Sequence, residues 1–320
     1  MRKFSFLSLS LVVLLAACGN STTSTLATTT ATTTSLSTTT AGTEAAGFPV
    51  TVETAYGPVT IPGQPNAIVS LSATATEILF SLGAGDQVVA VDEFSDYPSE
   101  APMTDLSGFT PNVEALASYN PDLVIVSFNP DNLVEALRSL DIPVIQQDTA
   151  FSIDDTYAQI EQLGAATGRV GDAAELVGDI RSRIEEVVAT VPDSAAGMTY
   201  YHELEDTLFS VTSSTFIGQL YSMLGLVNIA DGSDPDGFGY PQLSAEVIIE
   251  ADPDFIFLAD TVCCGQSAAT VAARPGWESL QAVANGRVVE LDDAVASRWG
   301  PRVVEFLEIV AGAVAGVPVG

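Results

Sequence analysis

The sequence predicts an α/β protein of two lobes, each built on a largely parallel sheet, with one long helix joining them. Short apolar, β-branched runs alternate with amphipathic stretches from residue 48 to 150, and the same alternation resumes from 196 to 320. Such alternation is typical of parallel sheets covered by helices on both faces. Between the halves, residues 173–191 carry an apolar i, i+4 stripe with no strand nearby. This stripe predicts a helix that crosses from one lobe to the other.

In the N-terminal lobe, residues 48–150, the segment VTVETAYGPVTIP predicts a hairpin-like pair of strands broken at Gly57 and Pro58. Strand and helix then alternate. The expected strands are AIVSLS, QVVAV, DLVIVS and IPVIQQ, and the expected helices are TATEILFSLGA, NVEALASY and LVEALRSL. Gly83 would end the first helix, because glycine readily adopts the left-handed conformation found there.

Residues 151–195 form the expected helical linker, with a weak point between Gly168 and Gly171. The C-terminal lobe, residues 196–320, repeats the theme. Its expected strands are MTYYHELE, DFIFLAD and RVVELD, and its expected helices are TFIGQLYSMLG, SAEVIIEA, GWESLQAV and PRVVEFLEIVAGAVAG. Two α/β lobes joined by a helix are typical of binding proteins, with the ligand between the lobes at the carboxyl ends of the strands.

Residues 1–18 have the features of an export signal. Arg2 and Lys3 precede an apolar core that is too short to span a bilayer. The run ends in LAAC, which resembles the lipobox of bacterial lipoproteins and implies cleavage before Cys18 and lipid attachment to its thiol. The alternative is an ordinary secretory signal with a chance cysteine. Both alternatives place the protein outside the cytoplasm, and the first anchors it to the cell membrane.

Residues 19–47 predict a disordered tether. Ser or Thr occupies 17 of the 23 positions from 21 to 43, and such a segment buries too little apolar surface to offset the entropy of ordering. Glycosylation of the tether stays open.

The chain is strongly acidic, with a net charge of −31. Signal cleavage would remove Arg2 and Lys3 and no acid, giving −33 and leaving no lysine. Nucleic acid and anionic lipid both require clustered cations, so neither is expected as a partner. The acidity favours a surface that keeps an exported protein soluble, and it points to no particular substrate. A monomer is expected.

Several motifs, in order, resemble a known family. They are SLSATATEILFSLGAGDQVVAV, SDYPSEA, NVEALASYNPDLVI, YPQLSAEVIIEADPDFIF and RPGWESLQAVANGRVVELD. Together they are similar to substrate-binding proteins of ABC importers that carry cobalamin, ferric siderophores or haem, and most similar to the cobalamin-binding members. The resemblance implies two Rossmann-like lobes of the class III periplasmic-binding-protein fold. It also implies a permease dimer with its ATPase as partner, a metal chelate as ligand, and no cofactor.

A helix-to-strand corner occurs twice, at NVEALASYNPDLVIV and SAEVIIEADPDFIFL, with Glu114 and Glu246 separated by 132 residues. In the family that these motifs resemble, one acidic residue on each lobe docks onto arginines of the two-fold symmetric permease. Glu114 and Glu246 match those positions. Both are also favourable at a helix start, where the helix dipole is positive.

Aromatic residues are the expected ligand contacts. By their place in the motifs, five of them fall on loops facing the gap between the lobes: Phe94, Tyr97, Phe109, Phe128 and Tyr240. Rigid rings suit a large flat ligand such as a corrin, porphyrin or catecholate chelate. The alternative for each ring is a place in the core, and Tyr97 could instead pack the turn before its proline. The cobalamin-binding relative has tryptophan where this chain has Phe109 and Tyr240.

Arg298 matches a cleft-facing arginine of that relative, and Trp299 lies beside it. Arg298 could hold ligand oxygens, or it could pair with one of the 41 acidic residues. Arg302 is expected to be structural. His202, the only histidine, could touch a chelate or serve as a buried polar residue. A bare transition metal would require more histidines, so no metal site is expected.

Cys263 and Cys264 are adjacent and follow the DFIFLAD strand. Outside the cytoplasm they are expected to form a disulfide, and the alternatives are two exposed thiols or a thiolate ligand.

The sequence thus favours an importer's receptor. No catalytic residues are expected, because the chain lacks a G-x-S-x-G motif and a second histidine. The alternative is a surface lipoprotein that senses a ligand or joins a complex without a transport role.

Overall fold

The computed structural model describes residues 47–54 and 56–317. The expected signal peptide, the lipidation site Cys18 and all of the expected tether except Gly47 lie outside these residues.

The N-terminal lobe is an α/β unit, as predicted. An antiparallel pair, β1 (Val50–Val52) and β2 (Val59–Ile61), precedes a parallel sheet of order β5-β4-β3-β6-β7. The strands of this sheet are β3 (Ile68–Leu71), β4 (Val88–Asp92), β5 (Met103–Leu106), β6 (Leu123–Val126) and β7 (Val144–Gln146). The helices are α1 (Ala73–Ser81), α2 (Val113–Ser118) and α3 (Leu133–Arg138), with single 3-10 turns η1 (Gly85–Gln87) and η2 (Pro130–Asn132).

The central strands β3 and β6 are buried along their whole length, as their unbroken apolar runs predict. Helix α1 begins where the Ser72 side chain accepts a hydrogen bond from the Ala75 backbone N–H. It ends before Gly83, whose φ of +70° is the left-handed conformation expected there.

The C-terminal lobe has a parallel sheet of order β11-β10-β8-β9. Its strands are β8 (Thr199–Glu203), β9 (Val227–Asn228), β10 (Phe255–Leu258) and β11 (Val288–Glu290). Its helices are α6 (Phe216–Met223), α7 (Ala245–Ala251), α8 (Thr261–Cys264), α9 (Ala268–Ala272), α10 (Gln281–Ala284) and α11 (Asp293–Ser297), with 3-10 turns η3 (Asp193–Ala195), η4 (Asp231–Ser233) and η5 (Trp277–Ser279).

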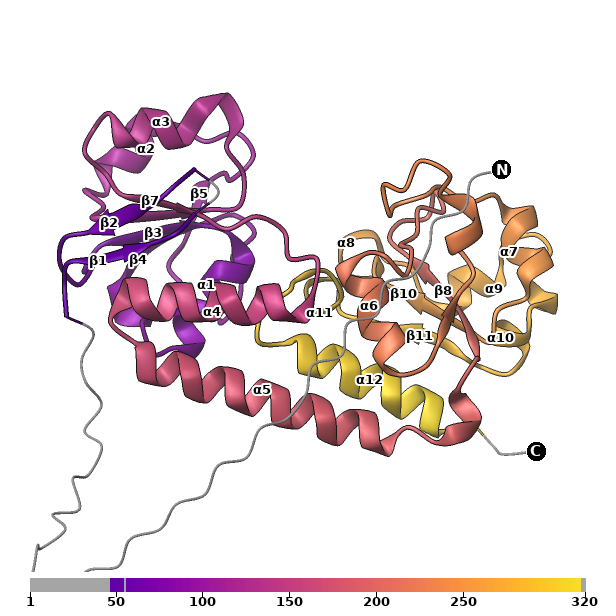
Figure 1. The fold of residues 1–320 in the computed structure, drawn as a ribbon. Coiled ribbons are helices and arrows are strands. Elements are labelled where there is room, and N and C mark those ends of the chain that lie inside the picture. Colours follow the sequence, from indigo (N-terminus) through magenta and orange to yellow (C-terminus); the bar gives the residue numbers. More distant parts are fainter. Residues whose placement is uncertain (1–46, 55, 318–320) are drawn as a thin grey trace, which may run out of the picture. The chain divides into compact units, whose positions relative to one another are not determined.

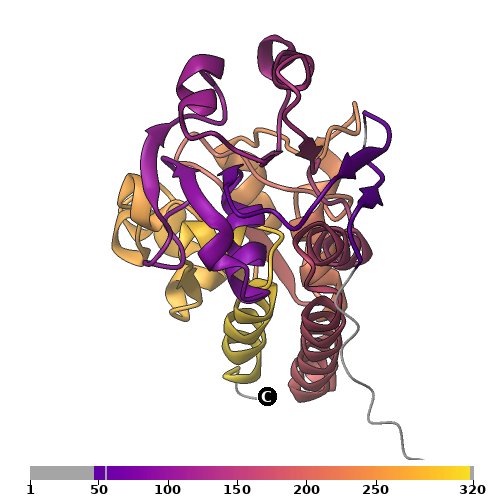
Figure 2. The ribbon, with the colours of Figure 1, turned by 90° about the vertical axis from the view of Figure 1, so that its left-hand side faces the viewer.

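Two helices link the lobes. Helix α4 (Ile153–Thr167) ends at Gly168, with φ +76°, and α5 (Val170–Thr190) follows as a helix of 21 residues. Figure 1 shows α5 passing below both lobes, and Figure 2 shows it beside the closing helix α12 (Val303–Ala315). The buried stripe of α5, which includes Val177, Ile180 and Ile184, packs into the core. The predicted crossing helix is confirmed.

The structure contains elements that the sequence did not predict, among them the short helices α8, α9 and α11. Strands β5 and β9 were not predicted, because both are short and partly exposed edge strands. GWESLQAV forms η5 and α10 rather than one helix, because Leu280 is extended, with ψ 139°. Arg298 and Arg302, near the end of the chain, hydrogen-bond to Glu77 of the first lobe. In the described part of the chain, no helix is long and apolar enough to cross a membrane.

Candidate ligand-binding cleft

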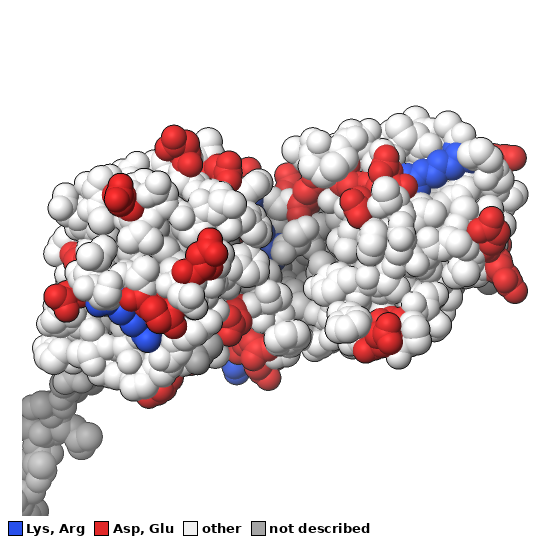
Figure 3. Space-filling view, turned by 90° about the horizontal axis from the view of Figure 1, so that it is seen from above, with Lys and Arg blue, Asp and Glu red and all other residues white. Residues whose placement is uncertain are grey.

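A cavity of about 430 Å³ lies at the carboxyl ends of the strands of the first lobe. The loops after β3, β4, β5 and β6 form one wall, and the connection between α11 and α12 closes it. Its lining consists of Leu71, Ser72, Ala73, Thr74, Asp92, Phe94, Gly108, Phe109, Ser127, Phe128, Ser297, Arg298 and Trp299. Figure 3 shows the molecule hollowed between the two lobes, with acidic side chains along the rim. Ligands of α/β proteins bind at this end of the sheet.

Three predicted aromatic residues meet in this cavity. The Phe109 ring stacks on Phe128 at 5.3 Å between centroids and meets Phe94 edge-on at 5.7 Å. The three side chains are 45 to 58% exposed, so they are not core residues. An exposed cluster of rings on a rigid sheet is a surface for a flat apolar ligand.

Gly108 explains how Phe109 reaches this position. A Cβ atom at Gly108 would lie 2.9 Å from the Leu71 carbonyl oxygen and 3.1 Å from the Asp92 carboxylate. The loop therefore passes closer to β3 than any other residue would allow. Ser107 Oγ accepts hydrogen bonds from the backbone N–H groups of Phe109 and Thr110, which fixes the turn.

The floor of the cavity is polar and internally bonded. Ser127 Oγ donates to Ser72 Oγ at 2.7 Å, and Ser95 Oγ donates to Asp92 Oδ1 at 2.6 Å. Burial raises the pKa of Asp92 above its ordinary value, although the bond from Ser95 opposes this shift. The floor thus supplies hydroxyl and carboxyl groups rather than cations.

Arg298 enters the cavity from the second lobe's chain and is held by three acceptors of the first lobe. Its guanidinium donates to Glu77 Oε1 at 2.8 Å, to the Phe94 carbonyl at 2.8 Å and to Asp96 Oδ1 at 2.7 Å. Both predicted roles therefore have a structural basis, because Arg298 lines the cavity and also forms ion pairs.

Arg302 donates to both oxygens of Glu77 at 2.7 and 3.1 Å, in line with its expected structural role. Its guanidinium also lies 4.1 Å from the centre of the Tyr97 ring. Tyr97 is absent from the cavity lining and packs on this arginine instead.

Trp299 lines the cavity while its polar edge is bound to the linker. The indole N–H donates to Gln159 Oε1 at 2.9 Å. The backbone carbonyl of Trp299 accepts a hydrogen bond from Thr156 Oγ1 at 2.9 Å. Both partners lie on α4, so α4 fixes the orientation of this ring.

Tyr240 lies apart from the three phenylalanines. It lines a second hollow of about 220 Å³ between the start of the linker and the loops of the second lobe. Phe151 and Phe238 line the same hollow and are 69 and 81% exposed. Sequence reasoning missed both, although Phe238 stands two residues before Tyr240 in GFGY.

His202 does not face the cleft, which corrects its assignment as a ligand contact. The side chain is completely buried in β8, and Nδ1 lies 2.9 Å from the Tyr221 hydroxyl. Burial lowers the pKa of His202 to about 3, so the ring stays neutral. The Tyr221 ring of α6 meets the imidazole edge-on at 5.7 Å, so this helix covers the residue near the strand end.

Glu114 and Glu246 occupy equivalent corners of the two lobes, and both are exposed in the first turn of a short helix. Figure 1 shows these helices, α2 and α7, on different lobes. A residue with positive φ ends each corner before its proline, Asn120 at +50° and Asp252 at +43°. Backbone hydrogen bonding and the Ser244 hydroxyl lower the pKa of Glu246. The repeated motif is therefore also a repeated structure.

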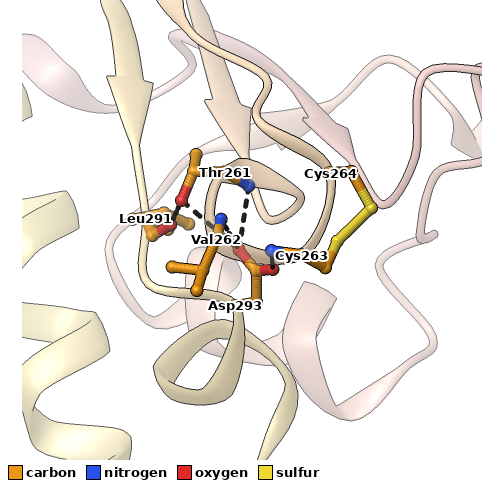
Figure 4. Close-up of a disulfide and its surroundings, with 6 residues drawn as sticks. All are labelled: Thr261, Val262, Cys263, Cys264, Leu291 and Asp293. Carbon is orange, nitrogen blue, oxygen red and sulfur yellow. Dashed lines mark hydrogen bonds between the residues drawn. A yellow bond between two sulfur atoms is a disulfide. The ribbon is translucent and has the colours of Figure 1, made fainter.

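Cys263 and Cys264 form a disulfide in α8, after β10 (Figure 4). The Asp293 carboxylate accepts hydrogen bonds from the backbone N–H groups of Thr261, Val262 and Cys263. Asp293 begins α11, the helix that leads to Arg298. Among the described residues, no group of three or more His, Cys, Asp or Glu side chains could hold a metal ion.

Another cavity, of about 450 Å³, lies at the amino ends of β10 and β11 beside the end of α12. Its lining includes Phe255 and Arg287 but no cluster of rings. It lies at the opposite end of the sheet from the usual ligand position, so the aromatic cavity is the better candidate.

A family model described as periplasmic binding protein matches residues 68–295. An uncharacterized ABC transporter substrate-binding lipoprotein of Bacillus subtilis is 32% identical over 275 residues, which cover 82% of this chain and 85% of that protein. A cobalamin-binding protein of Halobacterium salinarum is 35% identical over 280 residues, which cover 84% of this chain and 75% of that protein.

Solved structures agree with the fold. The periplasmic vitamin B12-binding protein of Vibrio cholerae has a TM-score of 0.65 and 26% identity, covering 78% of this chain and 96% of its own. A periplasmic haem-binding protein of Roseiflexus has a TM-score of 0.69 and 24% identity, covering 79% of this chain and 98% of its own, which is a likeness of fold alone.

Proposed function

This chain belongs to the periplasmic binding protein family, whose members serve ABC importers, and we propose that it captures a corrinoid in its aromatic cleft. Relatives throughout the family are binding proteins, so the chain is a solute-binding protein and not an enzyme. The family works outside the cytoplasm, and cleavage before Cys18 with lipid attachment there would hold this member at the membrane.

The observation that carries the proposal is the ring cluster of Phe94, Phe109 and Phe128. It presents exposed, mutually supported aromatic faces at the carboxyl ends of a parallel sheet. A corrin is a large ring system edged with apolar methyl groups and amides, so its burial against aromatic faces is favourable. Relatives named for cobalamin and vitamin B12 support this choice of ligand.

The direct test is titration calorimetry of the full-length chain with cyanocobalamin, cobinamide, a ferric hydroxamate and haemin. Stoichiometric binding of a corrinoid is the expected result. Binding of only the ferric hydroxamate or only haemin would retain the receptor and refute the corrinoid assignment. If none of the four ligands binds, the corrinoid proposal is wrong and the ligand belongs to another chemical class.

Phe109→Ala should weaken corrinoid binding by roughly tenfold to a hundredfold, because truncating a central stacked ring removes apolar contact worth about 1.5–3 kcal/mol. Phe151→Ala serves as the matched control, since Phe151 is also an exposed ring, at 69% against 58% for Phe109, but lines the smaller hollow. Calorimetry with cyanocobalamin measures both. Equal losses would show that the two rings contribute alike and that the Phe109 cluster is not the main ligand surface.

The proposed delivery route uses Glu114 and Glu246, which would dock onto cationic residues of a two-fold symmetric permease. Their exposed, equivalent positions on separate lobes support this role, because a two-fold partner requires two equivalent contacts.

A further inference from the structure

We infer that the carboxylates of Asp96 and Glu77 compensate the charge of Arg298, the cationic side chain of the cleft. As a result, the cleft selects chelates with an uncharged, amide-bearing periphery and rejects chelates that carry several carboxylates. This inference rests on the proposed receptor function, since it names the ligand class of the same cavity. Asp96 is the residue that sets the preference.

Arg298 is the one Lys or Arg among the described residues that line the aromatic cavity. In an anion receptor its guanidinium would be free to form paired hydrogen bonds with carboxylate or phosphate oxygens. Here one terminal nitrogen already donates to the Phe94 carbonyl and to Asp96, and the other donates to Glu77. Its positive charge is thus already compensated by the carboxylates of Glu77 and Asp96, and three of its five N–H groups are in use, so an incoming anion would gain less from this guanidinium than from an unpaired one.

The other charged side chains described near the cavity would not stabilise a bound anion. Arg302, the next cation along the chain, donates hydrogen bonds to both carboxylate oxygens of the same Glu77. Asp92 adds a further carboxyl group to the lining. Acidic side chains also line the rim of the hollow in Figure 3. An anionic ligand would therefore lose hydration and meet like charge without gaining a free cation.

The same groups suit a neutral ligand that donates hydrogen bonds. The carboxylate of Asp96 is on a side chain that is 62% exposed, and the Ser72 and Ser127 hydroxyls lie in the floor. Amide N–H groups at the edge of a flat ring could donate to such acceptors while the ring covers the phenylalanines.

Asp96 is the partner whose removal tests this idea without threatening the fold. Glu77 is 1% exposed and joins two arginines, whereas Asp96 is largely solvated and contacts Arg298 alone among the cations. Asp96→Asn removes one negative charge and so leaves Arg298 with Glu77 as its remaining counter-charge, while the asparagine oxygen can still accept the hydrogen bond. Glu93→Gln is the matched control, because Glu93 is an exposed acid in the same loop and makes no ion pair with Arg298.

The experiment titrates the full-length chain with two pairs of ligands that differ in charge. The first pair is cobinamide, whose corrin carries amides, and cobyrinic acid, whose corrin carries carboxylates. The second pair is a ferric hydroxamate without net negative charge and a ferric tris-catecholate. In each pair, we expect the less anionic ligand to bind at least about tenfold tighter. The ratio of the two dissociation constants should fall as the salt concentration is raised.

Asp96→Asn should tighten binding of the anionic ligand of each pair by about tenfold. The dissociation constant of the less anionic ligand should change by less than about threefold. For Glu93→Gln, the ratio of the two dissociation constants in each pair should stay within about twofold of the ratio for the unmodified chain. Equal or tighter binding of the anionic member by the unmodified chain would overturn the inference, as would equal effects of the two substitutions. If none of the four ligands binds, the corrinoid proposal fails, and the selectivity inference fails with it.

Discussion

Replacing Glu114 and Glu246 together by alanine should reduce cellular uptake of labelled cyanocobalamin by roughly a hundredfold while ligand affinity stays within about twofold. Each lost charge pair of about 1.4 kcal/mol weakens the docked complex tenfold. Neither side chain lines the aromatic cavity, so the ligand contacts are unchanged. Uptake is measured in cells that lack the native chain and express the full-length variant, and affinity is measured by calorimetry.

The control for docking removes two exposed glutamates of helix α5, as Glu175→Ala with Glu186→Ala. This variant has the same net charge as the docking variant but keeps both corners intact, so uptake should be nearly normal. Equal loss in both variants would mean that overall charge, rather than position, drives docking. Loss of ligand affinity in the docking variant would place these residues at the ligand instead.

The two single substitutions separate the two-fold model from a one-sided contact. With two equivalent contacts, Glu114→Ala and Glu246→Ala should each lower uptake by about tenfold. A defect confined to one substitution would indicate that only one lobe meets the permease.

The fold could be predicted from the sequence because its signals are local. Buried strands such as β3 and β6 are continuous apolar runs, and the stripe of α5 repeats every turn. Glycine at 83 and 168 marks two helix ends by its left-handed conformation. The short edge strands β5 and β9 carry no comparable pattern, since partner strands rather than composition define them.

The ring cluster of the cleft could be predicted because Phe94 and Phe128 follow predicted strands, whereas Phe109 was assigned from its place among the motifs alone. What the sequence does not reveal is which charges meet. Glu77 reads as part of an ordinary amphipathic helix, yet its partner Arg298 is 221 residues away. The same limit applies to His202, where strand-end position suggested exposure but the packing of neighbouring helices buries it.

This distant pairing gives the second large prediction. Glu77→Gln should lower the free energy of unfolding by about 3–5 kcal/mol, because it leaves Arg298 and Arg302 without their shared buried counter-charge. Glu77 is 1% exposed and both arginines are 13–14% exposed, so solvent screens the network weakly. Urea unfolding of the full-length chain, followed by tryptophan fluorescence, measures the change.

Glu308→Gln provides the comparison, since its ion pair with Arg183 has the same 2.7 Å length but both side chains are about half exposed. Solvated pairs of this kind contribute about 0–1 kcal/mol, so this variant should unfold almost as the unmodified chain does. Similar small losses in both variants would show that the Glu77 network adds little to stability. A large loss of unfolding free energy in Glu77→Gln alone would mean that the ion pairs beside the cleft also hold Arg298 and Arg302 against the first lobe. In that case ligand selectivity and stability depend on the same carboxylate, and Asp96 is left as the residue at which the charge of the cleft can change at little cost to folding.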